Sequence, residues 1–131
     1  MIALDASVLV AHLSPHDAHH HAATGLLRDA AGERLIAHDL TLAEVLVGGA
    51  RIGREEQMLA DLRAAGVQHA DRPEGEPLRL ARLRARTGLK LPDCCVLDAA
   101  LGHAASLATF NRTLVTAAQQ VNVEVLTAAG P

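Results

Sequence analysis

The chain has 131 residues, half of them hydrophobic and only one a Phe, Trp or Tyr (Phe110), so it is long enough for one domain with an aliphatic core. A formal net charge of −3 excludes a fold that attracts nucleic acid as a whole, so a phosphate-bearing ligand would need a local basic patch or a bound cation. The only cysteines, Cys94 and Cys95, are adjacent, which excludes a disulfide framework and fits a reducing compartment and a helix-packing role.

Short apolar segments alternate along the chain with segments of helical character. In chain order the pattern predicts a strand over 2–4, helices over 7–13 and 18–31, a strand over 34–37, helices over 41–50 and 54–65, a strand over 67–70, helices over 73–87 and 92–105, a strand over 107–110, a helix over 112–119 and a strand over 123–126. Thr41 and Glu44 have the spacing of a capping box at the start of a helix. Pro92 occupies a favoured position in the first turn of another.

The alternation of strands and helices implies a parallel sheet that helices cover on both faces. We therefore expect an α/β fold, a three-layer α/β/α domain around a central parallel sheet of four to five short strands. No internal repeat, linker or low-complexity segment interrupts the pattern, so residues 1–131 are expected to form a single domain.

Three carboxylates occur in apolar surroundings, where a soluble domain normally places core side chains. Asp5 follows a short apolar strand, Glu44 lies within the apolar run 40–47, and Asp93 lies between two apolar segments. An ionised carboxylate in a low-dielectric site is very costly without a partner. The only lysine near these residues is Lys90, so the pattern indicates a bound metal ion.

The predicted topology brings these residues to one edge of the sheet. Ligands of open parallel sheets bind beyond the carboxyl ends of the strands. Asp5 ends the first strand, Asn111 follows the fourth, and Glu44 and Asp93 lie near the beginnings of helices that face the same edge. These four residues are therefore expected to converge.

Four segments of the chain resemble, in order, the motifs of PIN-domain ribonucleases. Residues 2–10 (IALDASVLV) resemble the first motif, an apolar strand that ends in Asp-x-Ser, and residues 42–45 (LAEV) the second. Residues 91–101 (LPDCCVLDAAL) resemble the third, and residues 107–114 (LATFNRTL) the fourth. The resemblance covers nearly the whole chain and is greatest to the VapC toxins of type II toxin–antitoxin (VapBC) modules. It implies a PIN-like fold and Mg²⁺- or Mn²⁺-dependent cleavage of single-stranded regions of RNA.

The resemblance assigns the catalytic site to Asp5, Glu44, Asp93 and Asn111. The fourth position usually holds an aspartate, so Asn111 lowers the charge of the site by one and offers a weaker metal ligand. Asp98 could compensate, although five residues on a helix turn through roughly 500°, so Asp93 and Asp98 do not share one face well.

Each of these residues is expected to have a distinct role. Asp5 and Asp93 would be the principal metal ligands, because Mg²⁺ prefers oxygen ligands and keeps several waters. Glu44 would bind the metal through water or orient the nucleophile, and Ser7 and Thr109 would hydrogen-bond the carboxylates. The structural alternatives are a turn aspartate for Asp5, a capping-box residue for Glu44 and a first-turn charge on the helix dipole for Asp93.

Two further groups of residues have both a structural and a functional interpretation. His16, His19, His20 and His21 could bind zinc, but no Cys or acidic pair completes a site, so a solvated helix face is favoured. Arg79, Arg82 and Arg86 form a stripe on one helix that is either a surface face or a contact with RNA phosphates or an acidic antitoxin segment. Arg112, beside Asn111, is the best single candidate for contacting a substrate phosphate. With only Phe110 for base stacking, phosphate contacts and substrate shape should matter more in RNA recognition.

Three classes of function are compared. The leading one is a metal-dependent endoribonuclease toxin that cleaves tRNA, rRNA or mRNA and inhibits translation. The second is a non-catalytic PIN-like domain that binds RNA or protein, which Asn111 favours. The third, phosphoryl-transfer or phosphatase chemistry, lacks an acidic residue two positions after Asp5 and a phosphate-binding glycine loop.

The resemblance also implies partners, a VapB-like antitoxin and a second copy of the chain in a homodimer. The antitoxin would present Arg or Lys to the acidic residues. No signal peptide begins the chain, and no apolar run approaches the ~20 residues of a membrane span, so a cytoplasmic protein without a membrane partner is expected.

Overall fold

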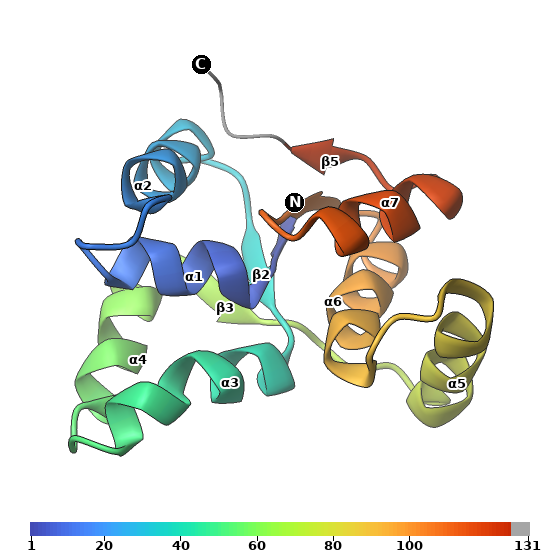
Figure 1. The fold of residues 1–131 in the computed structure, drawn as a ribbon, viewed down its shortest axis with the longest axis horizontal. Coiled ribbons are helices and arrows are strands. Elements are labelled where there is room, and N and C mark those ends of the chain that lie inside the picture. The colour runs from blue at the N-terminus through green and yellow to red at the C-terminus, as the bar shows by residue number, and fades with distance from the viewer. Residues whose placement is uncertain (127–131) are drawn as a thin grey trace.

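The computed structural model of the protein describes residues 1–126, which form five strands and seven helices (Figure 1). All neighbouring strands of the single sheet are parallel, and their order is β3-β2-β1-β4-β5. The strands are β1 (Ile2–Leu4), β2 (Leu35–Ala37), β3 (Val67–His69), β4 (Ser106–Ala108) and β5 (Val125–Leu126). The expected α/β fold with a central parallel sheet is therefore confirmed.

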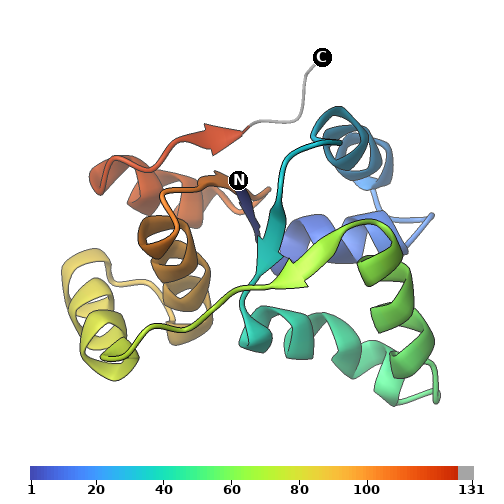
Figure 2. The ribbon, with the colours of Figure 1, turned by 180° about the vertical axis from the view of Figure 1, so that it is seen from behind.

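The helices lie on both faces of the sheet (Figures 1 and 2). They are α1 (Ala6–Leu13), α2 (His20–Asp29), α3 (Asp39–Ala50), α4 (Glu55–Ala64), α5 (Glu76–Thr87), α6 (Leu91–Gly102) and α7 (Arg112–Gln120). No helix within residues 1–126 has the length and apolar character needed to cross a membrane.

Side chains of the central strands alternate between two hydrophobic cores. Ala3, Ile36 and Leu107 belong to a core that α5, α6 and α7 complete. The neighbouring positions, which include Ile2 and Leu4, belong to a second core with α1, α2, α3 and α4. This period of two is the pattern of a strand buried on both faces, and it produces the three layers.

The register of the sheet positions the candidate site. In β1 and β4, Leu4 pairs with Ala108, so the residues that follow, Asp5 and Thr109, leave the sheet side by side. The backbone N–H of Asp5 donates to the carbonyl of Ala108 at 3.0 Å, which extends the pairing by one bond. Two connections that are distant in sequence therefore begin at the same point of the sheet edge.

The helix predicted over 41–50 begins two residues earlier than expected, and its cap differs. His38 is the N-cap of α3, and its ring Nδ1 accepts a hydrogen bond from the backbone N–H of Leu40 at 3.0 Å. Thr41 is buried inside the helix, and its hydroxyl has no hydrogen-bond partner among residues 1–126. The capping box of Thr41 and Glu44 was therefore a wrong prediction, because a side chain from the end of β2 supplies the acceptor.

Three other boundaries also differ from the prediction. β4 ends at Ala108, before the predicted Phe110, because the hydroxyl of Thr109 turns to Asp5. The helix predicted over 73–87 begins at Glu76, after Gly75 in a left-handed conformation (φ 86°). The helix predicted over 92–105 ends at Gly102, and Ala104 has a φ of 51° in the following turn.

Candidate acidic site

Asp5 is the buried centre of the candidate site, with a relative exposure of 6%. Its Oδ2 accepts hydrogen bonds from the hydroxyls of Ser7 and Thr109, each at 2.7 Å. No hydrogen bond from residues 1–126 reaches its Oδ1. One carboxylate oxygen is therefore held by the protein, and the other is left for a ligand.

The two hydroxyls that hold Asp5 are themselves fixed by the backbone. Ser7 Oγ accepts from the N–H of Phe110, and Thr109 Oγ1 accepts from the N–H of Asn111, each at 3.0 Å. Each hydroxyl donates its single proton to Asp5, so the 3.4 Å approach of Ser7 Oγ to Thr109 Oγ1 is a contact without a proton between them. These hydrogen bonds therefore orient Asp5 both from the start of α1, through Ser7, and from the residues after β4, through Thr109.

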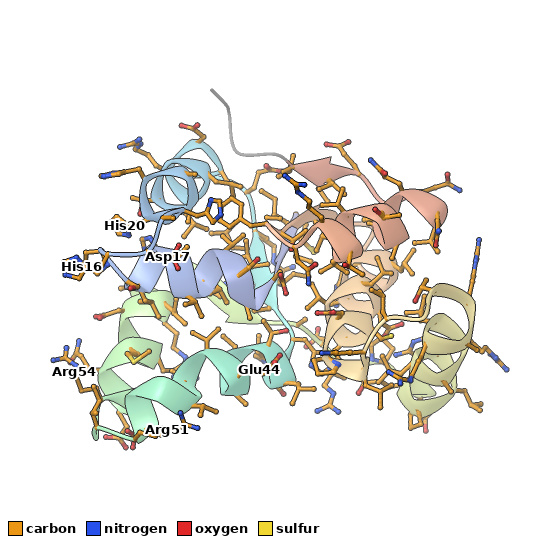
Figure 3. The ribbon with its side chains drawn as sticks, viewed as in Figure 1. His16, Asp17, His20, Glu44, Arg51 and Arg54 are labelled. Carbon is orange, nitrogen blue, oxygen red and sulfur yellow. The ribbon has the colours of Figure 1, made fainter. Side chains whose placement is uncertain are left out.

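Glu44 and Asp93 approach Asp5 from two helices. Glu44 is exposed on α3, and Figure 3 shows it on the half of this helix nearer to α6. Asp93 is half-buried in the first turn of α6. Contacts between α3 and α6, and between α6 and β1, bring the three carboxylates to the same edge of the sheet.

The electrostatics of Glu44 and Asp93 reflect this proximity. Partial burial raises the pKa of Glu44, and the negative charges of Asp5 and Asp93 raise it further. Burial also raises the pKa of Asp93, as does the charge of Asp5, while the charge of Lys90 opposes the shift. Carboxylates that repel each other in this way favour the approach of a cation.

The donor set fits a hydrated Mg²⁺ or Mn²⁺ ion better than a cage of protein ligands. Within residues 1–126, no three His, Cys, Asp or Glu side chains lie close enough together to hold a metal ion directly. Mg²⁺ usually binds one or two carboxylates and keeps several waters, so the free oxygen of Asp5 and the nearby Asp93 are a sufficient set. The residues present are therefore compatible with such an ion.

Asn111 lies next to this site but uses its amide oxygen for another purpose. It is the N-cap of α7, and its Oδ1 accepts from the N–H groups of Thr113 at 3.0 Å and Leu114 at 3.4 Å. Both acceptor positions of this oxygen are thereby used. The residue thus stabilises the helix that follows β4 and does not present a free oxygen to the carboxylates.

Asp98 does not join the acidic group. It is buried with a relative exposure of 8%, and it pairs with Arg79 of α5 through Nε–Oδ1 (3.0 Å) and Nη2–Oδ2 (3.2 Å) contacts. Arg79 also donates to the carbonyls of Pro73 and Glu74. The guanidinium of Arg79 is therefore engaged within the fold, and the ion pair connects α5 to α6.

The remaining basic candidates are exposed. Arg82 and Arg86 line a hollow of about 370 Å³ between α5 and α6, where Arg86 donates to the carbonyl of Gln120 at 3.3 Å. Arg112 is exposed in the first turn of α7, directly after Asn111. Arg112 thus lies close to the candidate site along the chain, whereas Arg82 and Arg86 belong to the α5 surface.

His38 is a buried polar residue that the sequence analysis missed. Its Nδ1 accepts from Leu40, so its Nε2 carries the proton and donates to Glu76 Oε2 at 3.1 Å. Arg72 binds the same carboxylate, with an Nη2–Oε1 distance of 2.7 Å. The available signal was a polar side chain directly after an apolar strand. This network fixes the start of α3, the helix that carries Glu44.

The four histidines at the α1–α2 connection and the start of α2 differ in their exposure and contacts. His16 and His21 are exposed, and His20 donates through Nδ1 to the carbonyl of Ala11 at 2.9 Å (Figure 3 labels His16 and His20). His19 instead stacks on Phe110. The solvated face favoured from the sequence holds for His16 and His21.

Comparison with known proteins places the chain in a family. A model of the PIN domain family matches residues 2–119. Solved structures with the same fold include FitAcB from Neisseria gonorrhoeae (20% identity, TM-score 0.72, 98% of both chains) and a toxin–antitoxin complex from Klebsiella pneumoniae (22%, 0.73, 99% of this chain and 98% of that one). VapBC2 from Rickettsia felis, bound to a promoter DNA fragment, is also similar (18%, 0.72, 96% and 98%). A search of curated protein sequences finds no significant match. With most of its length covered by the family model, this chain belongs to the PIN domain family.

Proposed function

We propose that this protein is a Mg²⁺- or Mn²⁺-dependent endoribonuclease, the toxin of a VapBC-type toxin–antitoxin module. It hydrolyses phosphodiester bonds in single-stranded regions of structured RNA (tRNA, rRNA or mRNA) in the cytoplasm and inhibits translation until its antitoxin neutralises it. The observation that carries this proposal is the environment of Asp5. Its carboxylate is buried, Ser7 and Thr109 donate to its Oδ2, and the carboxylates of Glu44 and Asp93 are near enough for its charge to raise their pKa values.

The chain supplies the groups that metal-assisted hydrolysis requires. Asp5 Oδ1 and Asp93 would hold the ion, and Ser7 and Thr109 keep Asp5 oriented without occupying that oxygen. When bound, the ion lowers the pKa of an attacking water and offsets the charge that develops on the phosphate. Glu44 has a raised pKa, which brings it closer to neutral pH and makes it a better proton acceptor for the attacking water.

Substrate binding would rely on positive charge beside the acidic residues. Arg112 is exposed at the start of α7 and would contact a phosphate of the RNA strand. Lys90 lies close enough to Asp93 to lower its pKa and is exposed at the N-cap of α6. These two cations offset the repulsion between RNA and the carboxylates.

Two features support an antitoxin partner and a homodimer. The solved structures of similar fold include a complex described as toxin–antitoxin and the VapBC2 complex. The surface of α1 and α3 exposes apolar side chains, namely Val10 (42%), Val47 (45%) and Ile52 (71%), the last just after α3. Exposed apolar patches of this kind are typical of protein interfaces. A basic antitoxin side chain that reaches the carboxylates would block the site.

A non-catalytic PIN-like domain is the second candidate. It is favoured by Asn111, whose oxygen caps α7 and so is not free for a metal ion. The Asn111→Asp variant tests this alternative. A parent that does not cleave RNA and an Asn111→Asp variant that remains inactive would favour the binding domain.

The decisive assay measures cleavage of structured RNA by the purified protein. We expect cleavage with Mg²⁺ or Mn²⁺, none with EDTA, and none after Asp5→Asn or Asp93→Asn. Glu44→Gln should retain metal binding but cleave slowly. Asp29→Asn and Glu56→Gln, which change exposed carboxyls of α2 and α4, are matched controls that should cleave as the parent does. Equal cleavage by the parent and by both Asp5→Asn and Asp93→Asn would exclude the proposed site.

A further inference from the structure

Two aromatic rings stack on each other where the α1–α2 connection meets the residues that follow β4. The imidazole of His19 and the phenyl ring of Phe110 have centroids 4.6 Å apart and planes inclined by 17°. Phe110 is half-buried and packs against the core of α1 to α4, whereas His19 is exposed. One face of Phe110 is therefore covered by His19, and the outer face of the imidazole continues the stack towards solvent.

Hydrogen bonds of the backbone fix both rings. The N–H of Phe110 donates to Ser7 Oγ at 3.0 Å. The N–H of His19 donates to Asp17 Oδ1 at 2.8 Å, in the connection between α1 and α2 where Figure 3 labels His16 and Asp17. Because both backbones are held, little order has to be gained when a flat ligand is added to the stack.

The same contacts connect the backbone of Phe110 to the acidic site. Ser7 Oγ, which accepts from Phe110, donates to Asp5 Oδ2. Phe110 also follows directly after Thr109, the second hydroxyl that holds Asp5. The backbone of Phe110 is thus two hydrogen bonds away from Asp5, so an RNA strand bound at Asp5 would have to extend past Phe110 to place a base on His19.

We propose that the exposed face of His19 stacks with an unpaired nucleobase of the RNA whose backbone lies at Asp5, with Phe110 supporting His19 from behind. This inference rests on the proposed function and assigns a base-binding subsite to it. Stacking on aromatic rings is how proteins bind single strands with little sequence preference. From the sequence, Phe110 was the only candidate for stacking, whereas in the fold its ring supports a second, exposed one.

The test measures binding of a short single-stranded RNA of mixed sequence, with one fluorescent adenine analogue whose emission stacking quenches. The full protein is used in Ca²⁺, and gels verify that the RNA remains intact. Parent, His19→Ala, His19→Phe and His16→Ala are compared, the last as a matched exposed histidine of the same connection. Thermal unfolding verifies that each variant is folded.

His19→Ala is expected to weaken binding by about 5- to 150-fold, which corresponds to the 1–3 kcal/mol of one stacked base. The variant should also lose the quenching at one position of the RNA. His19→Phe and His16→Ala should retain both the affinity and the quenching. Binding by His19→Ala that equals the parent's, or a parent that binds no RNA, would overturn the inference.

The outcomes also separate this inference from the proposed function. If the parent does not cleave RNA but His19→Ala alone loses affinity and quenching, the base subsite stands and the ribonuclease proposal fails. If the parent cleaves RNA with a KM that His19→Ala leaves unchanged, the ribonuclease proposal stands and the subsite fails.

Discussion

Thr109 Oγ1 lies 2.7 Å from Asp5 Oδ2, although 104 residues separate the two along the chain. The parallel pairing of β1 with β4 produces this contact, because Leu4 and Ala108 are partners and the next residue of each strand leaves the sheet at the same edge. The hydroxyl donates to Asp5 and accepts from the N–H of Asn111. Thr109 therefore connects the orientation of the central carboxylate to the start of α7.

Thr109→Val should destabilise the protein, because valine keeps the shape of threonine and removes its hydroxyl. The half-buried N–H of Asn111 would lose its acceptor, and Asp5 would lose one of its two donors. We expect the free energy of unfolding, measured in urea, to fall by about 1–3 kcal/mol. Thr113→Val on the exposed side of α7 is the control and should change it little. Equal stability of the two variants would contradict the role of Thr109.

The stability of the metal-free protein should depend on pH through Glu44 and Asp93. Their pKa values are raised above the ordinary 4.5 and 3.8, in both cases mainly by burial and then by neighbouring carboxylates. The folded state therefore keeps protons in a pH range where the unfolded chain has lost them. The free energy of unfolding should fall as the pH rises from these ordinary values through the raised ones.

Variants isolate this effect from the other titrating groups. Urea unfolding in EDTA should show that Glu44→Gln and Asp93→Asn gain stability relative to the parent as the pH rises through this range. Added Mg²⁺ should stabilise the parent at neutral pH and release protons, and it should stabilise Asp93→Asn less. Parallel pH curves for the parent and both variants would show that the pKa values of Glu44 and Asp93 are not raised in the folded state.

His38 should stabilise α3 through its cap. His38→Leu removes the acceptor for Leu40 and the donor for Glu76, so we expect a loss of about 1–3 kcal/mol in the free energy of unfolding. His38→Asn offers an oxygen to the N–H of Leu40 and should lose less. Amide hydrogen exchange at Leu40 measures the cap directly. Exchange of the Leu40 amide that is as slow in His38→Leu as in the parent would show that His38 does not cap α3.

Two adjacent glycines of α3 should respond in opposite directions to substitution. A Cβ on Gly49 would collide with the Sδ of Met58, where α3 packs on α4, whereas a Cβ on Gly48 meets nothing within 4 Å. Gly49→Ala should therefore lower the thermal unfolding temperature, and Gly48→Ala should raise it, because alanine favours a helix by up to about 1 kcal/mol over glycine. A stabilising Gly49→Ala would contradict the packing of α3 on α4.

Much of the fold was predictable because its signals are local. Short apolar strands such as residues 2–4 alternate with helices, and the parallel sheet follows from that order. The proximity of Asp5, Glu44 and Asp93 was also predictable, since the carboxyl ends of parallel strands share one edge. Their apolar surroundings in the sequence correspond to the burial that raises the pKa values of Glu44 and Asp93.

The missed features depend on contacts between distant segments. His38 is a rare cap, and it functions because Glu76 binds its other nitrogen. Asp98 was a candidate to compensate for Asn111, but in the fold it forms an ion pair with Arg79 of α5. Neither partner could be identified from the sequence near His38 or Asp98. The stack of His19 on Phe110 likewise requires the α1–α2 connection to meet the end of β4.

If Asp5 organises a ribonuclease site, RNA ends in cells should depend on its carboxylate, and these ends can be mapped. The parent and Asp5→Asn would be expressed at equal levels without antitoxin, and new RNA ends would be sequenced after induction. We expect new ends at a small set of single-stranded positions with the parent and none with Asp5→Asn. The same ends with both proteins, at equal frequency, would contradict this role of Asp5.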